Sequence, residues 1–570
     1  MKKYSFLLLT LFVIIGITFS CTKVLNQNPK GALSSEALQN AEGAESVVIS
    51  CYSILNNLNP QPAWGGVYGE NLYNPASNWE SGDLRSGDVY KGGGGTGDVA
   101  PLNSIELGLI DPTNEAVEDI WRAYFYAVIR CNNTLQLLNT ITTDVFPLRD
   151  QRIAEVKVLR GWFYFHLKLH YRTFPYIDEN VAPGTQQNVA NTLTEAELWD
   201  KIIADFQQGT NLPFTDLKSG RINKYVAYSL LCKAYMYTKN YALASNYADS
   251  VINSGVYHLQ SDLQGLYSDP NKESDGENIF SLAVNLNPGA DNNVRFNWGD
   301  LWVIPPGPYG GGDGFDRPSQ NLVNAFQVDS NGLPLLDTYN NTDFPPSNTT
   351  IPVDPRLDLA IGRPGITWKD YTIEPYTTNW ARTLDVYGPY SKKKNAIYVN
   401  SNLRSGGTTD FPWAGGALNF PFLKISDIML LKAEALIEMN QNLDQARDLI
   451  NQIRQRAQNT AYVKKFGDNS TNAANYQIGL YPATGWTQDY ARKAVRFERR
   501  LELCLEGQRF FDLVRWGVAD SVLTDYYNTE KTKRTYLTSA SYNGTKIDFY
   551  PVPQTEIDLS KGVLKQDPNY

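Results

Sequence analysis

The stretch that decides the fold is RFERRLELCLEGQRFFDLVRWG, residues 496–517. In its first half, acidic and basic side chains recur three and four positions apart, so they share one face of a helix. Gly507 interrupts that helix, and Arg509 then precedes Asp512 at a spacing that predicts an ion pair between them. We interpret the stretch as an internal lattice of ion pairs that ties two helices together, in preference to a ligand site.

Two segments upstream of this stretch resemble each other, residues 230–252 and 430–453. Each has paired leucines followed closely by alanine, Ala234 in the first segment and Ala433 in the second, and helical apolar spacing follows. Small alanines let two helices approach closely, and a single hairpin cannot bury its own apolar face, so such units stack. Both segments are therefore predicted to be helical hairpins of the tetratricopeptide type, without a strict repeat. Other helical signals are the apolar patterns at residues 34–58, 119–138 and 154–171 and the capping box at 194–197.

Two irregular stretches, residues 60–101 and 269–419, interrupt the helical patterns with Gly, Pro, Asn and aromatic residues. The fold predicted from this alternation is mainly α, with helical hairpins as a scaffold for a loop-rich region that carries short strands. Loops on a rigid scaffold are where binding residues concentrate, and tryptophans such as Trp298, Trp302, Trp368, Trp380 and Trp413 stand where a core is difficult to build.

The start of the chain has the pattern of an export signal. Lys2 and Lys3 precede an uncharged apolar run over residues 6–19, which ends at Ser20 and Cys21. That run is shorter than the about 20 residues that a membrane-spanning helix requires. A cysteine placed directly after a small residue resembles the lipobox of bacterial lipoproteins, so we expect lipid on Cys21. The alternative is an ordinary secreted protein cut near Ser20.

Composition limits the class of ligand. The chain has 570 residues, of which 42% are hydrophobic and 12% aromatic, with 35 Tyr and 12 Trp, and this supplies core material with rings to spare for a surface. A net charge of −9 argues against a nucleic-acid partner, whose phosphates require a basic face, and disfavours an anionic polysaccharide.

No catalytic or metal set emerges from the sequence, and no cofactor is predicted. Beyond Cys21 the cysteines are far apart, which favours buried free thiols over a disulfide framework or a zinc site. His166 and His170 share a helix face but lack a third ligand, so packed helix residues are favoured there. The glycine runs at 92–95 and 310–312 lack the Gly-Lys-Ser/Thr of a phosphate loop. A glycosidase pair of carboxylates would be invisible in sequence, so a hydrolase stays an alternative.

The opening stretch resembles the C-terminal signature of the SusD/RagB family, in which an arginine-rich helix is followed by E-G-x-R-x-x-D-L-x-R-W-G. Residues 427–435 resemble the last repeat-like hairpin of that family, residues 120–132 resemble an early helix, and residues 550–553 and 566–570 resemble its closing strand and tail. The resemblance covers the whole chain, including the signal peptide and lipobox.

The resemblance implies an outer-membrane lipoprotein facing the cell exterior, with four tetratricopeptide-like hairpins, that binds a nutrient, most often an oligosaccharide, above a SusC-like TonB-dependent transporter. It implies no enzyme and no membrane contact besides the lipid. The expected layout is a signal peptide at 1–20, a lipidated tether at 21–33, a helical region at 34–268, an irregular ligand-binding region at 269–419 and a C-terminal helical region at 420–570. Peptide capture by a RagB-like protein, an extracellular glycoside hydrolase and a scaffold that binds only its transporter are the alternatives.

The expected binding surface combines rings, which stack on sugar faces, with polar groups that hydrogen-bond hydroxyls. No individual ligand residue is carried over from the family, so the residues are chosen from the two irregular stretches of this chain. The first stretch contributes Trp64, Tyr68, Tyr73, Trp79, Asp83, Arg85 and Asp88, and the second contributes Trp298, Trp302, Tyr309, Asp313 and Phe315.

Overall fold

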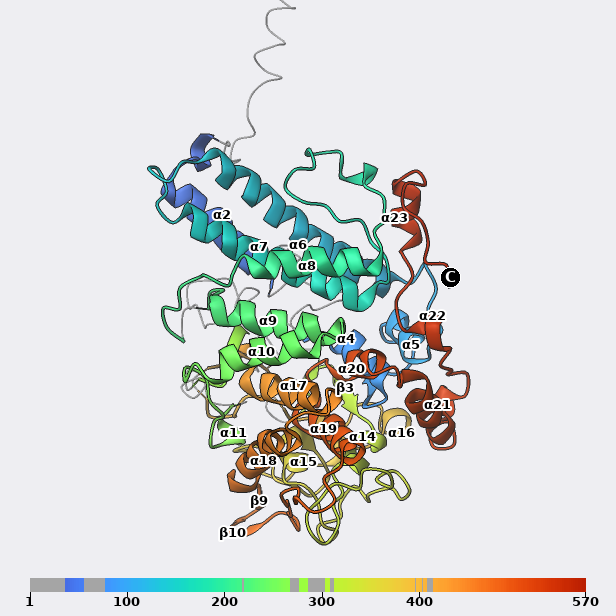
Figure 1. The fold of residues 1–570 in the computed structure, drawn as a ribbon. Helices are drawn as coiled ribbons and strands as arrows, with labels where there is room; N and C mark the ends of the chain where they lie inside the picture. The colour runs from blue at the N-terminus through green and yellow to red at the C-terminus, as the bar shows by residue number, and fades with distance from the viewer. Residues whose placement is uncertain are drawn as a thin grey trace, which may run out of the picture.

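The structure is a computed structural model that describes residues 36–55, 77–217, 220–266, 276–284, 303–307, 312–394, 396–401, 403–406 and 414–570. It is mainly helical with short two-stranded sheets, as predicted from the sequence. Helices stack from the N-terminal layer at the top of Figure 1 through a middle hairpin to the C-terminal helices below. Within the described ranges, no helix has both the length and the apolar character required to cross a membrane.

The N-terminal layer consists of α2 (Ala41–Ser53), α6 (Glu115–Thr140), α7 (Arg149–His170) and α8 (Glu195–Gln207). Asn114 begins α6 because its side chain accepts hydrogen bonds from the backbone N–H groups of residues 116 and 117. The capping box predicted at the start of α8 is present, with Thr194 and Glu197 each bonding the backbone of the other. These caps fix where the helices begin, and packing of their buried faces holds them together.

The two predicted hairpins are confirmed. They are α9 (Lys224–Tyr237) with α10 (Tyr241–Ile252), and α17 (Ile425–Glu438) with α18 (Leu443–Asn459). Ala234, Ala244, Ala433 and Ala446 are fully buried, which agrees with close helix contacts at small residues. Helix α10 packs against both α9 and α17, so the hairpins stack although a long segment of chain separates them.

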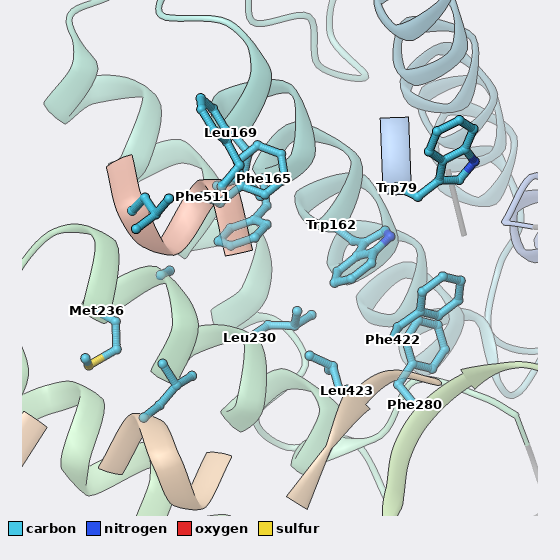
Figure 2. Close-up of a cluster of buried hydrophobic side chains, with 14 of the residues drawn as sticks. Trp79, Trp162, Phe165, Leu169, Leu230, Met236, Phe280, Phe422, Leu423 and Phe511 are labelled. Atoms are coloured by element: carbon cyan, nitrogen blue, oxygen red, sulfur yellow. The ribbon is translucent and has the colours of Figure 1, made fainter. Parts of the chain in front are cut away.

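One large core links the N-terminal, irregular and C-terminal regions (Figure 2). Trp162 of α7 lies 5.4 Å from Phe422, measured between ring centroids, and Phe422 lies 5.4 Å from Phe280. The last two rings belong to β8 (Phe420–Lys424) and β2 (Asn278–Leu282), which pair in an antiparallel sheet. The irregular region is therefore tied to the helical scaffold by shared apolar packing.

A smaller core corrects one expectation about the irregular region. Trp368, Tyr371, Tyr376 and Trp380 pack edge to face or stacked at centroid distances between 5.2 and 5.8 Å, and all are buried. Trp368 and Trp380 are thus core residues, because four large rings can bury one another without regular secondary structure around them. The same irregular region contains α14 (Gln320–Ala325), α15 (Arg356–Ala360), η5 (Thr378–Trp380), α16 (Leu384–Tyr387), β4 (Ile361–Gly362), β5 (Ser391–Lys392), β6 (Arg404–Gly406) and β7 (Ala414–Gly416).

The ion-pair lattice predicted from residues 496–517 is confirmed. Helix α19 (Gln488–Glu502) carries Glu498, which pairs with Arg356 at 2.6 Å and Arg454 at 2.9 Å, with all three side chains buried. On α20 (Arg509–Arg515), the expected pair of Arg509 with Asp512 is replaced. Asp512 instead contacts Arg499 and Arg515, and Arg509 lies over the Trp516 ring. The lattice joins α19 to elements distant in sequence, which helical spacing alone does not reveal.

The cysteines and histidines take the structural roles that were favoured. Cys51, Cys131, Cys232 and Cys504 are buried free thiols. His166 packs between the rings of Tyr124 and Trp162, and His170 contacts Asn78 through Nε2 at 3.2 Å. The remaining elements are η1 (Glu36–Leu38), α4 (Trp79–Gly82), η2 (Leu84–Ser86), β1 (Val89–Gly92), α5 (Ala100–Glu106), η3 (Gln186–Asn188), α11 (Leu263–Leu266), β3 (Phe315–Pro318), β9 (Lys464–Lys465), β10 (Asp468–Asn472), α21 (Ala519–Glu530), η6 (Thr535–Leu537), α22 (Gly544–Ile547) and α23 (Gln554–Leu559).

Candidate functional site

The two irregular stretches meet in a short antiparallel sheet. Strand β1 belongs to the first stretch and β3 to the second, with Tyr90 opposite Arg317 and Gly92 opposite Phe315. The chain on either side of this ladder carries the candidates that fall within the described residues. The sheet therefore brings the described candidates of the two stretches into one neighbourhood.

Two aromatic candidates in this neighbourhood are buried. Trp79 is 1% exposed and Phe315 is 2% exposed, and their ring centroids lie 6.0 Å apart. The expectation that both lie on a binding surface is therefore corrected. The ladder between β1 and β3 draws the two rings together, and burying such large apolar surfaces stabilises the junction.

Asp83, Arg85 and Asp88 are also buried, and each holds part of the C-terminal signature or the tail. Asp88 pairs with Arg500 at 2.5 Å, and Asp83 accepts a hydrogen bond of 2.9 Å from the backbone N–H of Gly507. The Arg85 guanidinium lies 3.9 Å from the centroid of the Phe510 ring and 4.2 Å from that of Tyr550.

These contacts correct the placement of three further candidates. Burial, together with nearby Asp316, raises the pKa of Asp83 well above its usual range, against the opposing effect of Lys392. The sequence predicts these polar residues to be ligand contacts in a loop, but a segment hundreds of residues later in the chain covers them. A ligand role would require that cover to be removed.

Gly507 shows why the signature contains glycine. Its φ is +68°, and a Cβ there would lie 2.5 Å from the carbonyl oxygen of Ser77. A side chain would therefore be strained in conformation and would collide with the backbone of the N-terminal segment. The absence of a side chain at Gly507 therefore lets the C-terminal signature pack directly against the backbone of the first irregular stretch.

Three charged residues beside the sheet, Asp98, Asp313 and Arg382, have partly exposed side chains. We call these three residues the loop edge. Their side chains are 29%, 26% and 40% exposed. Arg382 Nη1 lies 3.0 Å from Asp313 Oδ1 and 3.6 Å from Asp98 Oδ2. Partial burial raises the pKa of Asp313, while Arg382 acts in the opposite direction. The edge offers carboxylate acceptors and guanidinium donors side by side.

Backbone contacts hold the loop edge in place. Gly94 N donates to Asp98 Oδ2 at 2.6 Å, Thr383 Oγ1 donates to the Gly93 carbonyl at 2.9 Å, and Arg317 Nη1 donates to the Arg382 carbonyl at 2.7 Å. Beneath the glycine turn, burial lowers the pKa of Lys91 to about 8, and its Nζ donates to the Gly95 carbonyl at 2.8 Å. The glycine run is thus a tight turn that positions Asp98.

The small aromatic core supports the other side of the edge. Trp380 is 4% exposed and lies two residues before Arg382. A Cβ on Gly307 would lie 3.5 Å from the Trp380 ring, so the backbone of the segment 303–307 packs closely on it. Packed rings therefore hold the accessible polar groups on a rigid base, which suits a site that needs few accurately placed polar groups.

Sequence reasoning missed two residues of the loop edge, Asp98 and, most importantly, Arg382. Arg382 stands alone in a loop without a motif, and its partners Asp98 and Asp313 come from distant parts of the chain. Asp313 is the one predicted residue that the structure places at the accessible edge. The other predicted positions, Cys21, Trp64, Tyr68, Tyr73, Trp298, Trp302 and Tyr309, lie outside the described residues.

Among the described residues, no group of three or more His, Cys, Asp or Glu side chains could hold a metal ion. The loop edge can accept and donate hydrogen bonds and can form ion pairs. Both properties fit recognition of a polar ligand.

Comparison with known proteins connects this geometry to a family. Residues 276–570 match the sequence model described as the SusD family, and residues 100–236 match one described as "Starch-binding associating with outer membrane". The SusD-like protein P2 of Formosa agariphila is 21% identical, with all of both chains aligned.

Solved structures show the same fold. Surface glycan-binding protein A from Bacteroides thetaiotaomicron, in complex with laminarihexaose, superposes with a TM-score of 0.66 at 21% identity and covers 93% of this chain and 99% of its own. A SusD homologue from the same organism gives a TM-score of 0.69 at 19% identity, covering 95% of this chain and 100% of its own. The segment that carries the signature, the ion-pair lattice and most of the loop edge lies within the matched residues 276–570, more than half of the chain, and the protein belongs to the SusD family.

Proposed function

We propose that this protein binds an oligosaccharide or polysaccharide at the loop edge and delivers it to a SusC-like TonB-dependent outer-membrane transporter. The observation that carries the proposal is the match of residues 276–570 to the SusD family, in a chain whose structural neighbours include a protein solved with laminarihexaose. The accessible polar groups on a rigid base fit that ligand class.

The chemistry of the proposed site follows from its three charged side chains. Asp98 and Asp313 accept hydrogen bonds from sugar hydroxyls, and the exposed part of the Arg382 guanidinium donates to hydroxyl or ring oxygens. The rings proposed to stack on sugar faces are those of the neighbouring stretches, Trp64, Tyr68, Tyr73, Trp298, Trp302 and Tyr309. Because Trp79 and Phe315 are buried, they are proposed to support the site from beneath.

The proposal places the protein on the exterior face of the outer membrane. Lipid on Cys21 anchors the chain, residues 21–33 form the tether, and the lipid is the membrane contact. Several acyl chains on one cysteine would hold the protein firmly, whereas a single chain binds only marginally at about 0.8 kcal/mol per buried CH₂ group. A tethered binding protein stays beside its transporter while it exchanges ligand.

Peptide capture is the second candidate, and one observation favours it. At the described part of the edge the accessible groups are charged, while Trp79, Phe315 and Trp380 are buried. Acidic and basic pockets with few exposed rings are what a peptide site requires. A mixture of peptides offered in the binding assay therefore separates the two ligand classes.

Affinity electrophoresis tests the proposed function. The protein is run through native gels that contain laminarin, starch, xylan or galactomannan, beside gels without polysaccharide. Retardation by at least one polysaccharide is the expected result. Replacing Arg382 with Ala should weaken that retardation by roughly tenfold in affinity, because it removes the donors of the edge.

A matched control keeps this test interpretable. Leu148→Ala changes a residue that is 44% exposed at the start of α7 and should migrate like the wild type. Equal retardation of wild type and Arg382→Ala would contradict the loop edge as the site. Release of reducing ends from a retarding polysaccharide would contradict a purely binding role.

A further inference from the structure

A cleft of about 510 Å³ lies in the N-terminal layer. One wall is α6, another is the segment from Pro175 to Val189 between α7 and α8, and the third is the C-terminal segment around α23. In Figure 1 these elements lie in the upper half of the molecule, whereas β3 and α16 beside the loop edge lie lower. The cleft is therefore separate from the loop edge, and its volume falls within the roughly 300–1,000 Å³ of small-molecule sites.

Tyr126 of α6 is an exposed ring at this cleft that is nevertheless held in one position. Its side chain is 43% exposed. Arg130 lies over the ring at 4.9 Å from the centroid and donates a hydrogen bond to the phenolic oxygen. Arg130 is itself fixed by a bond of 3.2 Å from Nη1 to the Ser50 carbonyl. An exposed ring fixed in advance loses little freedom when a ligand stacks on it.

The floor of the cleft is aromatic and closely packed. Trp121 is 3% exposed, and its ring lies 4.7 Å from Phe125 and 4.9 Å from Tyr171, measured between centroids. The contact with Tyr171 is edge to face at 89°, a favourable arrangement for two rings. Such a floor keeps the shape of the cleft when the ligand enters.

Polar side chains stand around this apolar floor. Gln186 and Gln187 come from η3, Glu556 from α23, and Asp119 and Arg122 from α6. Burial and nearby Glu118 raise the pKa of Glu556, and Arg122 opposes them. With Arg130 over the Tyr126 ring, two carboxylates and two guanidinium groups balance in charge at the cleft, which favours a neutral ligand. Amides and carboxylates also form hydrogen bonds with hydroxyl groups.

We propose that this cleft is a second saccharide site, which takes a short run of sugar units from a neutral polysaccharide with Tyr126 as its stacking platform. The inference rests on the proposed function for its ligand class alone, because its residues are distinct from those of the loop edge. A long chain bound at both places gains avidity, since the second contact becomes intramolecular.

The test repeats affinity electrophoresis with variants of each site in the full-length protein. The gels contain laminarin, starch, xylan or galactomannan as the probes. Tyr126→Ala should weaken retardation about tenfold or more, and Gln187→Ala should weaken it in the same gels. Tyr126→Phe keeps the ring and should retain binding, while the similarly exposed Leu148→Ala should behave as wild type. Thermal unfolding of each variant shows that the fold is intact.

Each pattern of results decides between the two sites. Partial loss in Tyr126→Ala and in Arg382→Ala, with complete loss in the double variant, supports both. Full wild-type retardation of Tyr126→Ala in every gel overturns the cleft and leaves the loop edge standing. Loss in Tyr126→Ala without loss in Arg382→Ala supports the cleft and overturns the loop edge. Absence of retardation of the wild type in all four gels contradicts both proposals.

Discussion

Single buried charges join the N-terminal loop to the C-terminal signature. Asp88 and Arg500 are 1% and 3% exposed, and the carboxylate contacts Nε at 3.0 Å and Nη2 at 2.5 Å of the guanidinium. Such a two-point contact is geometrically specific. Each charge compensates the other in a region that water does not reach, so neither can be removed alone without leaving a buried charge unpaired.

Removing the Asp88 charge should therefore destabilise the fold. We expect Asp88→Asn to lower the free energy of unfolding by about 3–5 kcal/mol, measured by denaturant titration, because Arg500 is left uncompensated. Asp337→Asn is the matched control, since Asp337 pairs with Lys493 at an exposed site. An Asp88→Asn protein of wild-type stability that has lost polysaccharide binding would show that Asp88 is a ligand residue after all.

At this scale the sequence predicts residue types better than residue roles. The acidic and aromatic residues around the first irregular stretch are visible in the sequence, as is Asp313. The burial of the polar residues in the first irregular stretch depends on Gly507, Phe510 and Arg500, which lie more than 400 positions beyond Asp88. A spacing rule reaches only neighbours on one helix or strand, so it cannot show that the C-terminal signature covers these residues.

At the scale of elements, the stacked hairpins position everything else. Helix α10 lies against α9 and α17, and its buried residues include Ala244, Ala248 and Val251. The alanines allow close approach of the helix backbones, and close-packed interiors leave no room for added methylene groups. The position of the loops therefore depends on small residues in the helices beneath them.

Enlarging a buried alanine tests this arrangement. Ala248→Leu should destabilise the protein by about 1–3 kcal/mol, because the added atoms must displace packed neighbours. Ala242→Leu on the same helix is the control, since Ala242 is exposed and should change stability little. Thermal unfolding of both variants provides the measurement, and equal melting temperatures would contradict close packing at Ala248.

Helices were predictable where their signals are local, as at Thr194 and Glu197. The short strands β1 and β3 were not predictable. Each has four buried residues, so polar and apolar side chains do not alternate and give no periodic signal. They exist because partners from distant parts of the chain pair with one another. The core formed by Trp368 and Trp380 was missed for the same reason.

Across the whole molecule, the ion-pair lattice and the shared core act as one unit. Glu502 pairs with Arg456 at 2.5 Å, and Arg456 also pairs with Glu277 at 2.9 Å beside strand β2. Burial alone would raise the pKa of Glu502, but Arg456, Lys424, Arg356 and Lys394 outweigh it and lower the pKa to about 2. The lattice therefore joins the irregular region to α18 and α19 through charges that must stay ionised.

This arrangement predicts a specific sensitivity to acid. The ordinary pKa of Glu502 is 4.5, so its contribution to stability is complete above that pH and is lost as pH falls toward about 2. Glu502→Gln should be less stable than wild type at pH 7 by about 3 kcal/mol and should lose less stability between pH 5 and pH 3. Asp337→Asn, at an exposed pair, should follow the wild-type curve. Parallel stability curves for wild type and Glu502→Gln would contradict the role of this carboxylate.

The central claim is that a glycan binds at the loop edge, and hydrogen–deuterium exchange tests it most directly. Exchange is compared for the protein alone and with saturating oligosaccharide prepared from a polysaccharide that retards it. We predict slower exchange in residues 91–98, 312–315 and 378–384, because ligand contacts at Asp98, Asp313 and Arg382 suppress local opening there. Unchanged exchange in all three segments at saturation would contradict the claim.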